Sequence, residues 1–510
     1  MADIYERNEK LKLSKKELIT FIIIFAFSLI IFCQFLTGHN STDNYVIMEN
    51  GYHTYALNWS LVGGRVFMCV ICLIAGVFNI PNTVFVVSTL VIGLFISCIA
   101  VIVLKNIVLK YKPAKNKYHE WLVLLISFVT IFNFMYLEDM YFAECIVMSL
   151  SILLYMLAAK RLVYGGKHSV LKSLGLFILA VFSYQGTVGI FFALVVLFSI
   201  IKSVGESSTS DKTSFGSNKN RFYPYISNVI KGIAIMGIGI LVNIFQVKLT
   251  NFLLNTVQGR VGTISQIPQN IAFIIRNISE ILKNTCDLFP KWLFIIFLIC
   301  VVLVALFYFI KNKVAKKQIL LLFTIIIITI LSSFILFVMT TSSFYGGRMH
   351  FCIGAVFGIV LIFLYCNTNT FDTKFKYIIV TMLSCYFVVT MCMYVYFMYQ
   401  HKLINELERT EVLKINDYIE QYEKENNTTI ESVIIYYVPA ETDKAYRDNE
   451  IFKNTYNMEG TKAYWDVIYV INYYTGRNLK QIGAQILDSS IFPEGYECDG
   501  NILYINAYMN

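Results

Sequence analysis

TVFVVSTLVIGLFISCIAVIVL (residues 83–104) decides the fold class of this chain. The stretch is apolar along its length and contains no charged residue. About 20 apolar residues in a row suffice to cross a bilayer as an α-helix, and such a helix satisfies its own backbone hydrogen bonds inside the membrane. We therefore predict that residues 83–104 form a transmembrane helix.

The composition of the whole chain agrees with this prediction. Of its 510 residues, 57% are hydrophobic and only 15% are charged, and the mean hydropathy is +0.62. An ordinary soluble domain is much less apolar, so we predict an all-α polytopic membrane protein. Eleven transmembrane helices are expected, near residues 18–36, 83–104, 120–136, 141–159, 171–185, 187–203, 225–247, 292–310, 318–339, 351–366 and 377–399.

Residues 66–79 are also apolar, but this segment suits an interfacial or re-entrant helix better than a complete span. Counting it as a span would place the lysines between residues 105 and 117 outside, against the preference of basic residues for the cytoplasmic side. With the segment on the outer surface, 25 of the 32 Lys and Arg residues before residue 400 are cytoplasmic and 7 are external. We predict a cytoplasmic N-terminus and an external C-terminal segment.

Charge divides the chain into two predicted domains. Residues 1–399 carry a net charge of +17, whereas residues 400–510 carry −8. The basic excess reports membrane topology, and we expect no nucleic-acid partner. The acidic segment is predicted to be a small extracytoplasmic α/β domain, with helices near 403–425 and 462–474 and a strand near 432–438.

Acidic residues at the predicted outer face are the first candidates for chemistry, because charges close to a bilayer are costly and tend to be functional. Asp43 follows the first span by about six residues and is a candidate catalytic base. Glu138 and Asp139 occupy a tight turn between the third and fourth spans. They are further candidates, although a hydrated turn cap is the alternative.

External cations oppose these acids. Arg348 lies in a short loop and could bind a phosphate with its guanidinium group, with Arg65 as second choice. The alternative for Arg348 is an interaction with lipid headgroups, and Arg260, Arg276 and Lys283, in a longer loop, are weaker candidates. A base and a cation suit sugar transfer from a lipid phosphate, since the base activates the acceptor hydroxyl and the cation stabilises the departing phosphate. The chain has no Gly-rich phosphate loop, which disfavours a nucleotide-sugar donor.

The order of several short motifs resembles a known family. After the first span come Asn50-Gly51-Tyr52, Gly64-Arg65, Glu138-Asp139-Met140 and Ser183-Tyr184-Gln185-Gly186. This order, over most of residues 17–400, is similar to that of the bacterial Gtr-type (type II) glucosyltransferases, which have the GT-C fold. The resemblance implies transfer of glucose from undecaprenyl-phosphate-glucose to a surface polysaccharide such as O-antigen, on the outer side of the bacterial cytoplasmic membrane.

The resemblance also implies roles for single residues. An acidic residue of the first external loop lies at the reaction centre of GT-C enzymes, and by position this residue is Asp43. The family often has two adjacent acids there, but Asn44 takes the second place in this chain. We therefore expect Asp43 to act as a single base, with no required cofactor and no indicated divalent metal. In this mechanism Glu138 and Asp139 orient a substrate, and Arg348 or Arg65 stabilises the phosphate.

Aromatic and amide side chains complete the predicted substrate site. Tyr45, Tyr52, Trp59 and Tyr184 could stack on sugar rings, although an interfacial aromatic belt is the alternative, and Gln185 adjoins Tyr184. Trp465, Tyr473 and Tyr474 of the C-terminal domain could hold the acceptor, whereas a structural lid is the alternative. The predicted partners are a polyprenyl-phosphate-sugar donor, a polysaccharide acceptor and the lipid bilayer.

Two other functions remain open. A polysaccharide polymerase or ligase would also carry external acids, and the external loop 248–290 is long enough to fit that class. A lipid-linked sugar flippase or transporter would place charges in the middle of its spans. Lys231 lies near a cytoplasmic end and Glu144 within a turn of the outer face, which disfavours transport.

Overall fold

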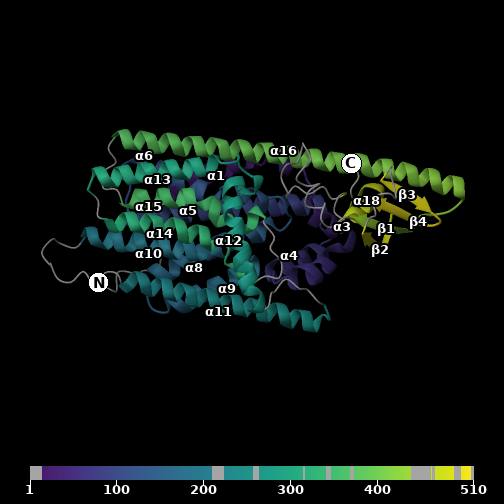
Figure 1. Cartoon of the computed structure of the whole chain (residues 1–510), viewed down its shortest axis with the longest axis horizontal. Helices are drawn as coiled ribbons and strands as arrows, with labels where there is room; N and C mark the ends of the chain where they lie inside the picture. Colours follow the sequence, from purple (N-terminus) through teal and green to yellow (C-terminus); the bar gives the residue numbers. More distant parts are fainter. Residues whose placement is uncertain are drawn as a thin grey trace.

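The computed structural model describes residues 14–209, 223–256, 264–313, 316–339, 346–367, 373–437, 461, 466–486 and 495–506. Figure 1 shows a bundle of helices that run along the longest axis, with a small sheet beyond one end of the bundle. The first half of the chain supplies α1 (Lys15–Ile31), α2 (Cys33–Leu36), α3 (Thr42–Tyr55), the π-helix η1 (Ala56–Leu61), α4 (Val66–Val77), α5 (Asn82–Tyr111), α6 (Lys117–Ile131), α7 (Tyr136–Asp139), α8 (Cys145–Tyr164), α9 (Ser169–Ser183), α10 (Gly189–Thr209) and α11 (Tyr223–Leu253).

The second half continues the helical bundle and then adds the sheet. It supplies η3 (Ile264–Gln266), α12 (Ile267–Asn284), η4 (Thr285–Asp287), α13 (Leu293–Lys311), α14 (Lys316–Ser332), η5 (Leu336–Met339), η6 (Gly347–Met349), α15 (Phe351–Asn367), α16 (Thr373–Asn426), β1 (Ser432–Tyr437), α18 (Val467–Thr475), β2 (Lys480–Ile486), β3 (Tyr496–Asp499) and β4 (Ile502–Asn506).

Each predicted span overlaps a helix, although residues 132–135 at the end of the span 120–136 and residues 141–144 at the start of the span 141–159 are not helical. The span 18–36 coincides with α1 and α2 together, and the span 318–339 with α14 and η5. Within the described residues, five helices are long and apolar enough to cross a membrane: Asn82–Tyr111, Cys145–Tyr164, Tyr225–Leu253, Leu293–Lys311 and Phe375–Asn426. These five helices support a multi-pass membrane protein, whereas the number of eleven spans remains a prediction.

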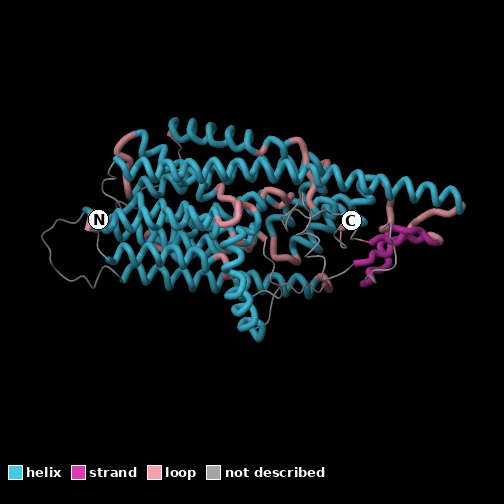
Figure 2. The backbone as a smooth tube through the Cα atoms, turned by 45° about the horizontal axis from the view of Figure 1, so that its top comes forward, coloured by secondary structure: helices cyan, strands magenta, loops and turns pink. Residues whose placement is uncertain are grey.

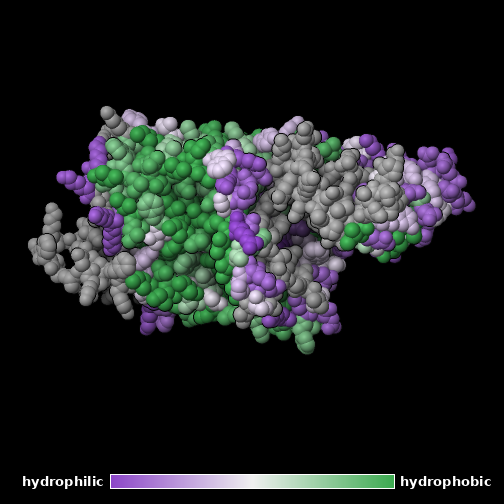
Figure 3. All heavy atoms as spheres, in the orientation of Figure 1, coloured by the Kyte–Doolittle hydropathy of each residue, from purple (hydrophilic) through white to green (hydrophobic). Residues whose placement is uncertain are grey.

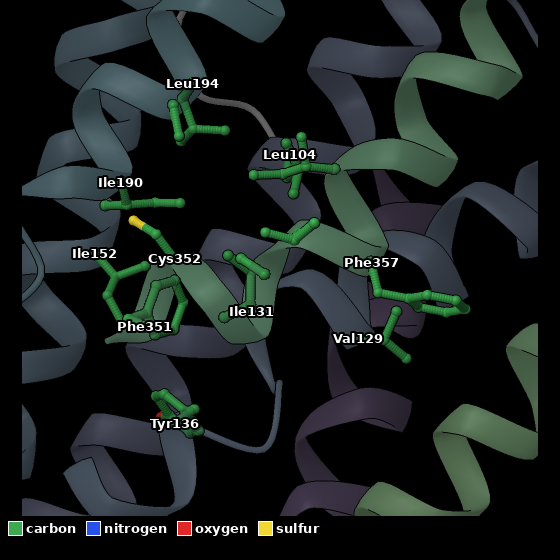
Figure 4. Packing of buried hydrophobic residues seen from close by; sticks show 14 of the residues in the cluster. Leu104, Val129, Ile131, Tyr136, Ile152, Ile190, Leu194, Phe351, Cys352 and Phe357 are labelled. Atoms are coloured by element: carbon green, nitrogen blue, oxygen red, sulfur yellow. The ribbon is translucent and has the colours of Figure 1, made fainter. Parts of the chain in front are cut away.

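Helix α15 forms the centre of the bundle. Its residues from Phe351 to Cys366 are all buried, as expected of a helix that is apolar on every side. Figure 4 shows Phe357 of α15 next to Val129 of α6 within the core cluster. A Cβ atom at Gly358 would collide with Thr130 of α6, so the glycine allows the two helices to approach closely. This packing fixes the loop at the start of α15, which carries Arg348.

The outer surface of the bundle shows where the apolar zone ends. In Figure 3 a broad hydrophobic band stops at a belt of hydrophilic residues, at the place where α12 lies across the bundle in Figure 1. Helix α12 is amphipathic, because Ile274 and Ile281 are buried while Arg276 and Glu280 are exposed. An amphipathic helix of this kind is suited to the boundary between lipid and water. Helices α3 and α4 and the sheet lie beyond this boundary (Figure 1).

The two ends of the bundle differ in their chemistry. At the end where α1 begins, Lys16 forms an ion pair with Glu120 of α6, and Lys105 of α5 lies 3.3 Å from the same carboxylate. At the end that α2 reaches, the His39 ring nitrogen Nε2 lies 3.2 Å from the carbonyl oxygen of Tyr141. The basic end is therefore opposite to the acids of α7. Which end faces the cytoplasm remains a prediction.

The apolar segment predicted to lie on the membrane surface forms the separate helix α4. At 12 residues, α4 is too short to cross a bilayer as a regular helix. Met68 and Cys72 are buried on one side, whereas Val70, Ile74 and Val77 are exposed on another. An apolar stripe left exposed beside a packed face is what a helix in the interfacial plane requires.

The C-terminal segment has the mixed α/β structure that its sequence pattern predicts. Its strands form one sheet in the order β2-β1-β4-β3, in which β1 is parallel to both neighbours and β3 is antiparallel to β4. Figure 2 shows this sheet beyond the end of the helical bundle. Helix α16 runs unbroken for 54 residues from the bundle into this domain, across the predicted boundary at residue 400. The predicted helix near 462–474 appears as α18, with Lys462 outside the described residues.

Candidate active site

Asp43 lies in the first turn of α3, after the N-cap residue Ser41. The amino end of a helix carries partial positive charge, which favours an ionised carboxylate at this position. Asp43 is half-buried, and its negative charge raises the pKa values of Tyr55, Arg348 and Asp466. The predicted base thus interacts electrostatically with groups of α3, of the η6 loop and of the C-terminal domain.

Glu144, at the start of α8, joins two other elements to this region. Its buried carboxylate forms an ion pair with Arg65 and accepts a hydrogen bond of 2.8 Å from the Tyr55 hydroxyl. Burial alone would raise the pKa of Glu144, but Arg65 and the Tyr55 hydroxyl lower it. Burial likewise opposes the charge of Arg65, yet Glu144 and two tyrosines raise the pKa of that guanidinium. Both members of the pair are thus charged at neutral pH.

The guanidinium of Arg65 has a second neighbour and an unused donor. It lies over the ring of Tyr184, 5.6 Å from the ring centroid, within the range of a cation–π contact. Its Nε is buried and has no hydrogen-bond partner among the residues that the structure describes. An arginine carries five N–H donors in a fixed plane. Arg65 can therefore keep its contact with Glu144 and still donate to an anion.

Arg348 is held in a similar way by Glu138 of α7. The backbone N–H of Arg348 donates to Oε2 of Glu138 at 3.2 Å, and the side-chain Nε lies 3.6 Å from Oε1. The guanidinium carbon is 4.0 Å from the centroid of the Phe142 ring. A Cβ at Gly347 would lie 3.0 Å from Glu138 Oε2 and would collide with Leu288, so this glycine lets η6 approach α7. Burial opposes the charge of Arg348, whereas Tyr184, Glu138 and Asp43 raise its pKa.

Asp139 differs from the other acids of the site. Its side chain is 0% exposed, and neither carboxyl oxygen has a hydrogen-bond partner within the described part of the chain. Burial and the neighbouring Glu138 raise the pKa of Asp139 well above its ordinary value, and Arg348 offsets this only in part. The uncharged form of the Asp139 carboxyl group is therefore favoured compared with that of an exposed aspartate. Burial also raises the pKa of Glu138.

These contacts bring together residues that are far apart in the sequence. The charge of Asp43 raises the pKa values of Tyr55 and Arg348. The Tyr55 hydroxyl donates to Glu144, which forms an ion pair with Arg65. Glu138 in turn pairs with Arg348. Tyr184 belongs to the same region: the Arg65 guanidinium lies over its ring, and burial raises its pKa while Arg348 opposes that shift. A half-buried carboxylate such as Asp43 can accept a proton, and the anchored guanidinium groups of Arg348 and Arg65 can bind a phosphate.

Comparison with known families shows the family of this chain. Residues 32–365 match the family model described as glucosyl transferase GtrII, which is more than half of the chain. The chain belongs to the GtrII glucosyltransferase family. The resemblance that the motif order suggested is thereby confirmed, and a search among curated proteins found no match. The GtrII match includes every predicted site residue from Asp43 to Arg348 and ends before α16 and the C-terminal domain begin.

Gln185 of this GtrII chain supports the loop that carries Arg65. Its Nε2 donates to the carbonyl oxygen of Gly63 at 3.3 Å, and Asn243 Nδ2 of α11 donates to that of Gly64 at 3.2 Å. Gly64 has a φ of +81°, and a Cβ there would lie only 2.6 Å from Gln185 Nε2. Glycine is the residue that adopts this conformation without strain. Gln185 is therefore placed to position Arg65 through the backbone.

The predicted sugar-stacking residues have different surroundings. The Tyr45 ring is fully buried, and its hydroxyl donates to Glu408 of α16 at 2.6 Å and lies 3.0 Å from that of Tyr474. Tyr45 thus connects α3 to the C-terminal domain. Tyr184 is 4% exposed beneath Arg65, so its ring is also covered. Tyr52 is half-buried and Trp59 is 37% exposed, and these two retain open ring surface.

Sequence reasoning did not include Tyr55 and Glu144 in the GtrII site. A signal existed for Glu144, because an acid at the start of a long apolar run needs a cationic partner. Among the weaker candidates, Arg276 and Lys283 lie on α12, whereas Arg260 and Trp465 lie outside the described residues. Within the described part of the chain, no group of three or more His, Cys, Asp or Glu residues is arranged to hold a metal ion. A mechanism without a required metal remains a prediction.

Proposed function

We propose that this GtrII chain transfers glucose from a polyprenyl-phosphate-linked donor to a hydroxyl group of a cell-surface polysaccharide. The observation that supports this proposal best is the charge of Asp43 acting on Arg348, a half-buried arginine that Glu138 holds, with Arg65 held in a similar way by Glu144. The reaction needs a proton acceptor for the incoming hydroxyl and positive charge for the departing phosphate. This site offers both.

The proposed step is a direct displacement. Asp43 takes the proton of the acceptor hydroxyl while that oxygen forms a bond to the anomeric carbon of glucose. The bond between this carbon and the phosphate oxygen breaks, and the electron pair leaves with the polyprenyl phosphate. One displacement inverts the configuration at the anomeric carbon. The leaving group is an anion, so positive charge near the phosphate lowers the barrier without a proton donor.

Arg65 and Arg348 are the proposed phosphate ligands. Each guanidinium is held by a carboxylate and an aromatic ring, Arg65 by Glu144 and Tyr184, and Arg348 by Glu138 and Phe142. Such anchoring fixes the donors before the substrate binds, and pre-arranged donors stabilise developing charge more effectively than mobile ones. The unused Nε–H of Arg65 is the donor we assign to the phosphate.

Glu138 and Asp139 take a different role from the one expected from the sequence alone. With exposed fractions of 1% and 0%, both carboxyl groups lie beneath the surface of the site. We assign them to positioning: Glu138 orients Arg348, and Asp139, whose raised pKa favours the uncharged form, supports α7. A second ionised acid there would weaken the binding of an anionic donor.

The same geometry supports a proposal for the placement in the cell. The Lys-rich end of the bundle, near Lys16 and Lys105, suits the cytoplasmic side of a bacterial inner membrane. The opposite end, with Asp43 and the C-terminal domain, would then face outward, where polysaccharides such as O-antigen are accessible. Undecaprenyl phosphate is the proposed carrier lipid, because its phosphate would reach the headgroup level marked by α12.

Glucose transfer by the purified full chain tests this proposal. The chain is placed in lipid nanodiscs with radiolabelled polyprenyl-phosphate-glucose and isolated surface polysaccharide, and parallel reactions contain UDP-glucose instead. We expect label in the polysaccharide only with the lipid donor. Arg65→Gln and Arg348→Gln should each slow transfer about 100-fold or more, whereas Arg276→Gln, on the exposed face of α12, should leave the rate unchanged. Transfer from UDP-glucose at an equal rate would overturn the assigned donor.

A further inference from the structure

A cavity of about 370 Å³ lies where α3, the start of α5 and the C-terminal helix α18 meet. This volume is within the range of about 300–1,000 Å³ that is typical of small-molecule sites. Gly51 and Tyr52 line the cavity from α3, Asn82 from α5 and Tyr473 from α18. Among the residues that the structure describes, none that lines the cavity is charged. Its chemistry therefore differs from that of the arginine-rich site.

Asn82 lines this cavity with an amide group that makes no hydrogen bond within the described residues. Neither the Nδ2 nor the Oδ1 atom of Asn82 has a hydrogen-bond partner among the described residues, and both atoms are buried. An amide buried without partners costs free energy, so each such group in a protein calls for an explanation. Asn82 also begins α5, and no side chain caps the free N–H groups of this first turn. A ligand with hydroxyl groups could form hydrogen bonds with the Asn82 amide and with these free N–H groups.

Two tyrosine rings border the same space. The Tyr52 hydroxyl donates to the carbonyl oxygen of Ile80 at 2.8 Å, and its ring contacts Phe85 edge to face at 5.0 Å, which fixes the orientation of the ring. Tyr473 of α18 is 40% exposed. Gly51 between them has a φ of +76°, and a Cβ there would meet no atom within 4 Å. The kink at Gly51 therefore keeps one wall of the cavity open.

The cavity lies further along α3 than Asp43, the proposed base. Ile47, one of its lining residues, follows Asp43 by four positions, and residues four apart share one side of a helix. Four residues correspond to a rise of about 6 Å along the helix axis. A saccharide chain of two or three units is long enough to extend from the cavity to Asp43.

We propose that this cavity is a binding subsite for a neutral saccharide unit of the acceptor, away from the reacting hydroxyl. The assignment rests on the proposed glycosyl transfer for its biological meaning. Aromatic rings, an amide and the absence of charge are the features that suit an uncharged sugar, which presents C–H faces and hydroxyl groups. The C-terminal domain contributes Tyr473, so this domain takes part in choosing the acceptor.

Saccharide binding without any donor tests the subsite independently of transfer. Saturation-transfer NMR is recorded on the full chain in nanodiscs with methyl glycosides of glucose, galactose and rhamnose as probes. At least one probe should bind, and Tyr473→Ala and Asn82→Ala should each weaken it about tenfold, a loss of ~1.4 kcal/mol. Tyr473→Phe keeps the ring and should retain binding, as should Asp43→Asn.

The control variant is Tyr377→Ala, because Tyr377 is 67% exposed near the start of α16, at the opposite end of the bundle. It should bind the probe as strongly as the unaltered chain. Binding by none of the three glycosides, or equal binding by the Tyr473→Ala, Asn82→Ala and Tyr377→Ala variants, would overturn the subsite. Saccharide binding in a chain that fails to transfer glucose would support the subsite and refute the proposed reaction.

Discussion

The buried ion pair between Arg65 and Glu144 gives the most quantitative prediction. The two side chains are only 16% and 1% exposed. Exposed ion pairs contribute about 0–1 kcal/mol, but removing one partner of a buried pair leaves a charge without compensation and costs about 3–5 kcal/mol. Glu144→Gln keeps the size of the side chain and an oxygen that can accept from Tyr55. Because Arg65 keeps some contact with solvent, we expect a cost of about 3 kcal/mol.

A double-mutant cycle measures this interaction. The free energy of unfolding is determined in mixed detergent micelles, by tryptophan fluorescence, for Glu144→Gln, Arg65→Met and the double variant. The double variant removes both charges, so its cost should be lower than the sum of the single costs by about 2 kcal/mol. Lys16→Met is the control, since Lys16 is 63% exposed in its pair with Glu120, and it should cost about 1 kcal/mol or less.

The pH dependence provides a second check. Because Arg65 and Tyr55 lower the pKa of Glu144 in the folded chain, its contribution to stability is complete above the ordinary value of 4.5 and is lost as the pH falls through the folded value. The difference between the unaltered chain and Glu144→Gln should therefore decrease below about pH 4.5. A cost under 1 kcal/mol at pH 7, or single costs that simply add, would refute a buried ionic pair.

Three further substitutions test other parts of the structure. Asp139→Asn should stabilise the chain more at pH 8 than at pH 4, because the folded carboxyl keeps a proton that the unfolded chain loses as the pH rises above its ordinary pKa of 3.8; equal shifts of the unfolding temperature at both pH values would contradict this. Tyr45→Phe removes the donor to Glu408 and should cost about 1–3 kcal/mol and speed proteolysis within the C-terminal domain, so an unchanged cleavage rate would argue against this link. Gly358→Ala should cost about 1–3 kcal/mol through its collision with Thr130, and an unchanged unfolding temperature would refute the close packing of α6 and α15.

The helical architecture could be predicted because it depends on local composition. Long apolar runs such as residues 83–104 leave a backbone in lipid no alternative to the helix, and α5 (Asn82–Tyr111) extends this run by several residues at its basic end. The C-terminal strand near 432–438 was also recognisable from its β-branched and aromatic residues. The order β2-β1-β4-β3 was not, because strand neighbours are chosen by packing between distant segments.

The candidate site could be predicted only in part, for a related reason. Asp43 and Arg348 stand out in the sequence as charges next to apolar runs. Which acid holds which arginine depends on how α7, α8 and η6 pack, and this information is not local. Glu144 was noted only as a charge close to the outer face, although it is the partner of Arg65. The sequence predicts that Tyr45 stacks on a sugar, but its ring is buried because the C-terminal domain covers α3.

The rate of glucose transfer by Asp43→Asn tests the central claim most directly. Asparagine has nearly the same shape as aspartate but cannot accept a proton, and loss of a general base lowers rates by about 100- to 10,000-fold. Glu49→Gln is the matched control, because Glu49 is an exposed acid on the same helix that accepts a hydrogen bond from Asn472. We predict that Asp43→Asn, folded as judged by its unfolding temperature, transfers glucose from polyprenyl-phosphate-glucose at least 100-fold more slowly, while Glu49→Gln keeps the full rate. Full transfer by folded Asp43→Asn would contradict the account.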